Sequence, residues 1–285
     1  MQTAIANTST STSHSLSRVK GGSLLNQGFL IDMDGVLYRG NHIISGAKEF
    51  IKVLQRLDIP HLFLTNNSKQ TQRDISLKLK DKLGVEVSPS NIYTSAMATA
   101  EFLATEISKG SAFVIGEGGL LKAVDDAGFA ISETAPDYVV VGEGRTLTME
   151  AVEKAIDFII AGARFVVTNL DPSPRIKGWP KPGTAAIASM ITEATGIKPL
   201  SCGKPSPILM RSARKRLGLR TRAMTVIGDT METDIYGGIS MGYQTILTLT
   251  GATKEEDLHK YPYSPNMIVN SIGEITVQLE EIYND

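Results

Sequence analysis

Carboxylates stand at two points of the chain where an apolar run ends. Asp32 and Asp34 follow the apolar residues 29–31, and carboxylates two positions apart project to the same side of an extended chain. Asp229 and Asp234 lie where a second apolar run passes into a helical stretch. Carboxylate oxygens at such a junction suit a hard cation such as Mg²⁺. Ligand sites in open α/β sheets lie beyond the carboxyl ends of strands, which is where both pairs stand.

Two further segments carry groups that suit an anion. The run Thr65-Asn66-Asn67-Ser68 offers hydroxyls and amides just before a helical stretch, and the first backbone N–H groups of a helix attract anions. The same residue types favour helix N-caps, so a capping role is the alternative. Gly203 lets the backbone approach closely and Lys204 supplies a positive charge, although a lysine before a proline is also common at a solvated helix entry. The segment is not a P-loop, because Pro205 replaces the Ser or Thr of that motif.

Short apolar runs alternate with helical stretches along the chain, which predicts an α/β fold with largely parallel sheets. Too many units alternate for one compact sheet, so we expect two α/β layers, divided near Ser95 and Leu200. The predicted strands are 28–32, 61–65, 112–115, 138–141, 165–168, 223–227, 244–249 and 266–269. The predicted helices are 46–57, 70–83, 96–107, 120–127, 148–161, 184–195, 207–217 and 272–282.

The composition is that of an ordinary globular protein and excludes several classes. The chain has 285 residues, 42% of them hydrophobic, and a net charge of −1. A protein that binds nucleic acid would normally carry a basic excess, so that partner is disfavoured. A single cysteine, Cys202, excludes an internal disulfide framework and a cysteine-based zinc cluster. No apolar run approaches the length of a membrane-spanning helix, so we expect no membrane partner.

The first 27 residues differ from the rest of the chain. Ten Ser or Thr occur between Met1 and Ser23, and no Asp or Glu precedes Asp32. Such a segment buries too little apolar surface to become ordered, so a flexible Ser/Thr-rich tail is predicted for 1–27 and a cytoplasmic location for the protein. The alternative is an organellar transit peptide, which has a similar composition. Only Arg18 and Lys20 supply positive charge in this segment.

Five ordered motifs make the sequence recognisable. They are Asp32-Met-Asp34-Gly35-Val-Leu-Tyr38-Arg-Gly40, Thr65-Asn66-Asn67-Ser68, Val167-Thr168-Asn169-x-Asp171, Gly203-Lys204-Pro205-Ser206-Pro207 and Gly228-Asp229-Thr-x-x-Thr233-Asp234. Over residues 28–275 the chain resembles the haloacid dehalogenase superfamily of phosphatases. It is most similar to the NagD-like branch, which includes p-nitrophenyl, phosphoglycolate and nucleotide phosphatases. One departure from the branch is Gly144 before Arg145, where an Asp is usual.

This resemblance implies a fold and a division into domains. The expected fold is α/β, with a Rossmann-like core that contains a parallel sheet and an inserted α/β cap domain. Residues 28–93 and 202–285 would form the catalytic core, and 94–201 would form the cap that selects the substrate.

The resemblance also implies roles at the ends of the core strands. Asp32 would attack phosphorus to give an aspartyl-phosphate, and Asp34 would act first as general acid and then as general base. That division of labour needs Asp32 ionised and Asp34 protonated at the start. Mg²⁺ would be held by the Asp32 carboxylate, the Asp34 carbonyl and the Asp229 carboxylate, with Asp234 in support.

The remaining site residues would bind the phosphoryl group or select the leaving group. Charge stabilisation of the phosphoryl oxygens is assigned to Thr65, Asn66, Asn67 and Lys204. Discrimination between substrates must come from residues that touch the leaving group, which all lie outside these core motifs. We expect this discrimination in the loop 169–182, which carries four prolines. The candidates are Asn169 and Asp171 in this loop, and Arg145 elsewhere in the cap.

The predicted function is therefore a Mg²⁺-dependent phosphatase that hydrolyses small phosphomonoesters. Phosphoglycolate, nucleoside monophosphates, sugar phosphates and p-nitrophenyl phosphate are candidate substrates. The alternatives are a phosphotransferase or mutase on the same core, and a non-catalytic sensor of a phosphorylated ligand. The expected partner is a small phosphorylated metabolite, and members of this branch often form homodimers through the cap.

Overall fold

The computed structural model describes residues 28–171, 175–176, 179–180 and 182–284. The predicted tail 1–27 lies outside the described residues, as do 172–174, 177–178 and 181 of the loop 169–182. None of the helices in the described ranges has the length and apolarity needed to cross a membrane.

A six-stranded parallel sheet forms the core, in the order β15-β14-β13-β1-β4-β5. Phe29, Leu30 and Ile31 of β1 are fully buried, because helices cover both faces of the sheet. The strands are β1 (Gly28–Asp32), β4 (His61–Thr65), β5 (Ile92–Thr94), β13 (Met224–Gly228), β14 (Gln244–Thr248) and β15 (Met267–Val269).

Helices cover both faces of this sheet. One face packs against α1 (Ala47–Arg56), α2 (Gln72–Leu83) and α9 (Ile272–Asn284). The other face packs against α7 (Pro207–Arg216) and the start of α3 (Ser95–Glu106). The side chain of Thr71 caps α2 and Gly84 ends it in the left-handed conformation, as the sequence predicts for a glycine stop.

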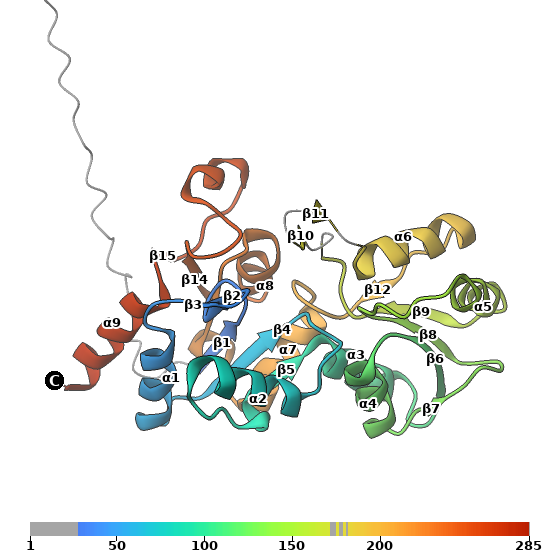
Figure 1. Cartoon of the computed structure of the whole chain (residues 1–285), viewed down its shortest axis with the longest axis horizontal. Coiled ribbons are helices and arrows are strands. Elements are labelled where there is room, and N and C mark those ends of the chain that lie inside the picture. The colour runs from blue at the N-terminus through green and yellow to red at the C-terminus, as the bar shows by residue number, and fades with distance from the viewer. Residues whose placement is uncertain (1–27, 172–174, 177–178, 181, 285) are drawn as a thin grey trace, which may run out of the picture.

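A second sheet of five parallel strands lies in the other half of the molecule, in the order β12-β9-β8-β6-β7 (Figure 1). One face packs against α3 and α4, and the other against α5 and α6. The elements are β6 (Ser111–Ile115), α4 (Gly118–Asp126), β7 (Ala130–Ile131), β8 (Tyr138–Val141), α5 (Met149–Ile160), β9 (Arg164–Val167), α6 (Thr184–Thr195) and β12 (Leu200–Ser201). We call this unit the cap and the six-stranded unit the core.

Several short elements were not predicted from the apolar pattern. Two of them adjoin the ends of core strands, namely the hairpin of β2 (Tyr38–Arg39) with β3 (His42–Ile43), and α8 (Tyr236–Ser240). One turn of π-helix, Met231–Ile235, leads into α8. A second hairpin, β10 (Arg175–Ile176) with β11 (Trp179–Pro180), was not predicted either. The same holds for the short strands β5, β7 and β12 and for the 3₁₀ segments Pro89–Asn91, Thr221–Ala223 and Glu255–Lys260.

Parallel pairing brings the carboxyl ends of β4, β1, β13 and β14 to one edge of the core sheet. Each of these strands is followed by polar residues, and the segment after β12 enters the same region. The fold thus brings motifs that are far apart in the sequence to one edge of the core sheet.

Candidate active site

Asp32 and Asp34 lie on a tight turn that follows β1. The Gly35 N–H donates to the Tyr38 carbonyl (2.7 Å) and the Leu37 N–H donates to the Met33 carbonyl (2.9 Å), so the chain reverses at once. Gly35 has φ of 89°, a conformation that side chains disfavour. A Cβ at Gly35 would also overlap Oδ2 of Asp229. The glycine of the first motif is therefore required by close packing of the turn against the end of β13.

Lys204 connects two of the predicted site carboxylates. Its Nζ donates to Oδ1 of Asp32 at 2.7 Å and to Oδ1 of Asp234 at 2.8 Å. Lys204 is only 4% exposed, so the reading of this lysine as a solvated helix entry is wrong. Burial lowers its pKa, but Asp234 and Asp32 raise that pKa well above its usual range. Lys204 thus stays charged.

Backbone and hydroxyl groups hold the two carboxylates that follow β13. Asp229 accepts the Ala252 N–H at Oδ2 (2.6 Å) and the Thr230 hydroxyl at Oδ1 (3.1 Å). Asp234 Oδ2 accepts the Thr230 N–H (3.3 Å) and the Thr233 hydroxyl (3.4 Å). Thr230 precedes the π-helical turn Met231–Ile235 as its N-cap residue, and its side chain accepts no hydrogen bond from that turn, so these side chains serve the site instead of capping the turn.

The loop after β14 belongs to the site, although the sequence motifs did not reveal it. The Thr253 N–H donates to the Asp229 carbonyl (3.0 Å), and the Thr250 hydroxyl donates to the Gly35 carbonyl (2.5 Å). The signal that could have found this loop is positional, since Thr250-Gly-Ala-Thr253 is a polar run at the carboxyl end of a predicted strand.

Three carboxylates form one cluster. Oxygens of Asp32, Asp229 and Asp234 all lie within 4.8 Å of one another. Burial raises the pKa of Asp32 to about 6 and that of Asp234 to about 6, although Lys204 opposes both shifts. Burial and the charge of Asp234 also raise the pKa of Asp229. One lysine does not balance three carboxylates, so the cluster favours a further cation.

The cluster fits a hard divalent cation on its own chemistry. All its candidate ligands are oxygens, which is the donor type that Mg²⁺ takes in proteins. The raised pKa values of Asp32, Asp229 and Asp234 indicate that their negative charges are poorly compensated in the metal-free site. A bound divalent cation would supply that compensation.

Asp34 occupies a different environment from Asp32. Asp34 is exposed, its backbone bridges to Tyr38 of β2, and Lys78 of α2 is the positive charge that acts on it most strongly. Displacement of solvent by the surrounding protein raises the pKa of Asp34, and Lys78 acts against that shift. Lys78 itself lies 4.7 Å from the centre of the Tyr38 ring and donates to the Tyr38 hydroxyl (3.3 Å). The raised pKa favours the protonated form that a general acid requires.

The Thr65–Ser68 run forms a hydrogen-bonded loop and does not cap a helix. The Asn67 N–H donates to Thr65 Oγ1 (3.0 Å), and Asn67 Oδ1 accepts the N–H of Lys69 (2.9 Å). The capping alternative is wrong, since the N-cap of α2 is Thr71. Thr65 is therefore the last residue of β4 and Asn66 the first residue beyond it, beside the Asp32 end of β1.

Asn66 lies between the lysine motif and the cap. Its side chain contacts the backbone of Lys204 on one side and the carboxylate of Asp171 on the other, at 2.7 Å from Oδ1. The structure thus brings Asp171, expected at the leaving group, into contact with a core motif. Asn169 is buried and accepts the Thr168 hydroxyl (2.8 Å).

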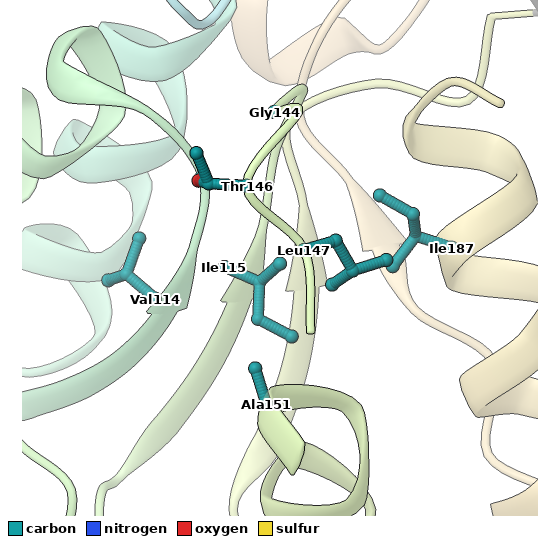
Figure 2. Close-up of a pocket in the computed structure, with 8 residues that line it drawn as sticks. Val114, Ile115, Gly144, Thr146, Leu147, Ala151 and Ile187 are labelled. Carbon is teal, nitrogen blue, oxygen red and sulfur yellow. The ribbon is translucent and has the colours of Figure 1, made fainter. Parts of the chain in front are cut away.

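Arg145 lies apart from these contacts. It is exposed, and its backbone N–H donates to Glu117 Oε1 (2.8 Å). Its neighbours Gly144 and Thr146 line a cavity of about 130 Å³ in the cap. Figure 2 shows Ile115, Leu147 and Ile187 around this largely apolar cavity.

A separate ion pair joins the core loop to the cap. Lys69 Nζ lies 2.6 Å from Glu143 Oε1, and both side chains are largely buried. The Gly119 N–H donates to the Lys69 carbonyl (2.8 Å), and the Glu143 N–H donates to the Ser68 hydroxyl (2.9 Å). Polar contacts thus join cap and core at Ser68 and Lys69 as well as at Asn66.

Comparison with known proteins identifies relatives over nearly the whole chain. A family model for haloacid dehalogenase-like hydrolases matches residues 29–130, and a second HAD-hydrolase-like model matches 201–275. Dihydroxyacetone phosphatase of Corynebacterium glutamicum is 38% identical, over 92% of this chain and 94% of the relative. Ribonucleotide monophosphatase NagD of Escherichia coli K12 is also 38% identical, over 87% of this chain and 97% of the relative.

Solved structures of such enzymes have the same fold. The 4-nitrophenylphosphatase of Thermotoga maritima superposes with a TM-score of 0.85 at 32% identity, and 90% of this chain and 99% of that one are covered. NagD of E. coli K-12 superposes with a TM-score of 0.81 at 36% identity, and the coverage is 87% and 97%.

Proposed function

The chain belongs to the haloacid dehalogenase-like hydrolases, in their NagD-like branch, and we propose that it is a Mg²⁺-dependent phosphatase that acts through an aspartyl-phosphate on Asp32. Its membership already makes it a hydrolase of phosphomonoesters. The single observation that carries the proposal is the contact of Lys204 Nζ with Asp32, at 2.7 Å in a site with two further carboxylates.

Asp32 is the nucleophile in this proposal. Its carboxylate ends the central strand of the core sheet, so the backbone beneath it is fixed by parallel pairing on both sides. The bond that forms joins an Asp32 oxygen to phosphorus, and the bond that breaks joins phosphorus to the leaving oxygen. Lys204 acts against the effect of burial on Asp32, because a hydrogen bond from a cation lowers the pKa of a carboxyl and favours the carboxylate form.

Asp34 handles the proton. It gives its proton to the leaving oxygen in the first step and takes one from the attacking water in the second. Its raised pKa supports the first of these roles. Asp32 and Asp34 differ in their contacts, because Lys204 donates a hydrogen bond to Asp32 and not to Asp34.

The residues that would hold Mg²⁺ are Asp32, Asp229 and the carbonyl of Asp34. When bound, the ion would neutralise charge on the phosphoryl oxygens and on the carboxylate cluster. Asp234 supports the site by holding Lys204. Thr65, the backbone of Asn66, and Lys204 would donate to the phosphoryl oxygens, and Asn67 would support them by shaping the loop around Lys69.

Substrates are proposed to be small phosphorylated metabolites. Relatives carry the names dihydroxyacetone phosphatase, acid sugar phosphatase and ribonucleotide monophosphatase. Dihydroxyacetone phosphate, sugar phosphates and nucleoside monophosphates are therefore the first compounds to test, together with phosphoglycolate and p-nitrophenyl phosphate.

The test measures phosphate release from this panel, with Mg²⁺ and with EDTA. Hydrolysis of one or more compounds that depends on Mg²⁺ is the expected result. Transfer of phosphate to a sugar without release would show a phosphotransferase. Binding of the compounds without any turnover would show a sensor, and either result would overturn the proposal.

A further inference from the structure

The side chain of Asn66 is fully occupied by three partners. Its Oδ1 accepts the Lys204 N–H (2.8 Å), and its Nδ2 donates to the Lys204 carbonyl (3.1 Å). The same Nδ2 donates to both oxygens of Asp171, at 2.7 and 3.0 Å. These partners fix the orientation of the amide, because only Nδ2 can face a carboxylate and a carbonyl together.

The Asn66 amide pairs with both the N–H and the carbonyl of Lys204, as the backbone of a neighbouring β-strand would. Gly203 permits it, because a Cβ there would overlap the Thr168 carbonyl and come within 2.6 Å of Asn66 Oδ1. The Gly203 N–H also donates to the Thr168 carbonyl (2.7 Å). The lysine motif is thus held between a core loop and the end of a cap strand.

A continuous set of contacts runs from the cap to the nucleophile. Asn66 joins Asp171 to the backbone of Lys204, and the Nζ of Lys204 contacts Asp32. Asp171 is partly buried, and both of its carboxylate oxygens accept from Asn66. A hydrogen bond to a charged acceptor is about twice as strong as a neutral one, so Asp171 holds Asn66 firmly.

We propose that Asp171 is a positioning residue, which fixes Lys204 through Asn66 and does not select the leaving group. A lysine side chain has a flexible four-carbon stem, so its ammonium is placed accurately only when the backbone below it is fixed. The cap supplies that fixation through the Asp171 carboxylate, together with the Thr168 carbonyl that accepts the Gly203 N–H. Lys204 is therefore placed for chemistry only while the cap is seated on the core. The inference rests on the proposed function, because it assigns Lys204 to the phosphoryl group.

The first test compares Asp171→Ala and Asp171→Asn with the wild-type chain. Asp171→Ala leaves one Asn66 donor without its partner, and kcat/KM falls by about 10- to 100-fold. The loss is the same within about threefold for p-nitrophenyl phosphate, dihydroxyacetone phosphate and a nucleoside monophosphate, since all share the phosphoryl group. Asp171→Asn restores much of the loss, because its Oδ1 still accepts from Asn66.

A second measurement, inhibition by inorganic phosphate, tests the phosphoryl-binding site with a ligand that has no leaving group. The inhibition constant of inorganic phosphate rises in Asp171→Ala, because phosphate contacts Lys204 and carries no group that could reach a specificity residue. An unchanged phosphate constant, together with losses that differ strongly between substrates, would place Asp171 at the leaving group and overturn the inference.

Glu143→Gln is the matched control. It breaks a different polar contact between cap and core, the ion pair with Lys69, and the Glu143 side chain has no hydrogen bond to Asn66 or Lys204 among the described residues. We expect its kcat/KM to change by less than about threefold. If Glu143→Gln matched Asp171→Ala on every substrate and on phosphate, loose docking of the cap would explain both, and the positioning role of Asp171 would be rejected.

Failure of the proposed function can be distinguished from failure of the positioning role of Asp171. A wild-type chain that hydrolyses none of the panel would end the proposed function. Calorimetric titration of inorganic phosphate into wild type, Asp171→Ala and Asp171→Asn would still test the contact. Equal phosphate affinities in all three would then reject the positioning role on its own.

Discussion

Lys204 Nζ lies 2.8 Å from Asp234 Oδ1, and the two residues are only 4% and 1% exposed. Asp234 therefore depends on Lys204 for its compensating charge, just as Lys204 depends on Asp234 and Asp32. Removing one member of a buried pair leaves an uncompensated charge, which costs far more than the pair contributes when intact.

Lys204→Met should therefore destabilise the metal-free protein by about 3–5 kcal/mol at pH 8, measured by urea unfolding. The deficit should shrink at pH 5. Asp32 and Asp234 already have pKa values of about 6 with Lys204 present, and without it both carboxyls become protonated at pH 5 and need no cation. A deficit that is equal at the two pH values would show that packing, not charge, is lost.

Asp32→Asn should abolish turnover while the fold remains. The amide occupies the same space and can still contact Lys204 through its oxygen, but it cannot attack phosphorus. A loss of several orders of magnitude in kcat is expected, because the members of a catalytic unit do not act additively. Circular dichroism controls for folding, and near-normal p-nitrophenyl phosphate hydrolysis by the folded variant would end the aspartyl-phosphate mechanism.

Metal removal has a predicted effect on stability as well as on activity. The folded-state pKa of Asp32, about 6, lies above the ordinary carboxyl value of 3.8. The stability that this proton provides is fully present below pH 3.8 and is lost as the pH rises through 6. Mg²⁺ should thus raise the melting temperature more at pH 7.5 than at pH 5. Activity should vanish in EDTA and return with Mg²⁺.

Asp229→Asn provides the matched variant for that measurement. Its carbonyl can still accept the Ala252 N–H and its NH₂ can donate to Thr230, so both contacts persist. With one buried charge removed, the metal-free variant should melt at a higher temperature than the wild-type chain at pH 7.5. It should also lose most of the Mg²⁺-dependent increase. An undiminished increase would place the ion away from Asp229.

Gly35→Ala should impair the site, whereas Gly40→Ala should not. Both glycines have positive φ, 89° and 59°, so both variants carry about 1–2 kcal/mol of backbone strain. A Cβ at Gly35 also displaces Asp229, whereas a Cβ at Gly40 meets open space. The Mg²⁺ concentration for half-maximal activity should rise about tenfold or more in Gly35→Ala only. Similar values for both variants would mean that strain alone is responsible.

The alternating pattern of the sequence located the large helices and most strands, because parallel strands with both faces buried read as short apolar runs. It missed β5, which follows a short 3₁₀ turn (Pro89–Asn91) and has only three residues. It also missed α8, because Gly237 and Gly238 weaken the helical signal where the backbone packs against Pro205 and Thr245.

The site residues at the carboxyl ends of strands could also be predicted from the sequence, because the strands themselves could be located. Asp32 and Asp229 follow predicted strands, and parallel pairing alone brings them to one edge. The side-chain role of Asn66 was not predictable, because its partners Lys204 and Asp171 are distant in sequence and only the packed cap and core define them. Homodimer formation through the cap stays a prediction.

The strand order of the core has a consequence for a growing chain. The central strand β1 pairs with β4 on one side and with β13 on the other, and the whole cap lies between these neighbours in the sequence. The cap has its own apolar clusters, and domains generally fold as units during synthesis. Asp32 is thus synthesised early, whereas Lys204, Asp229 and Asp234 are synthesised only in the last third of the chain. A chain that stops before Gly203 lacks Lys204, Asp229 and Asp234 and cannot assemble a phosphoryl site, so activity requires that synthesis has passed the cap and reached Asp234.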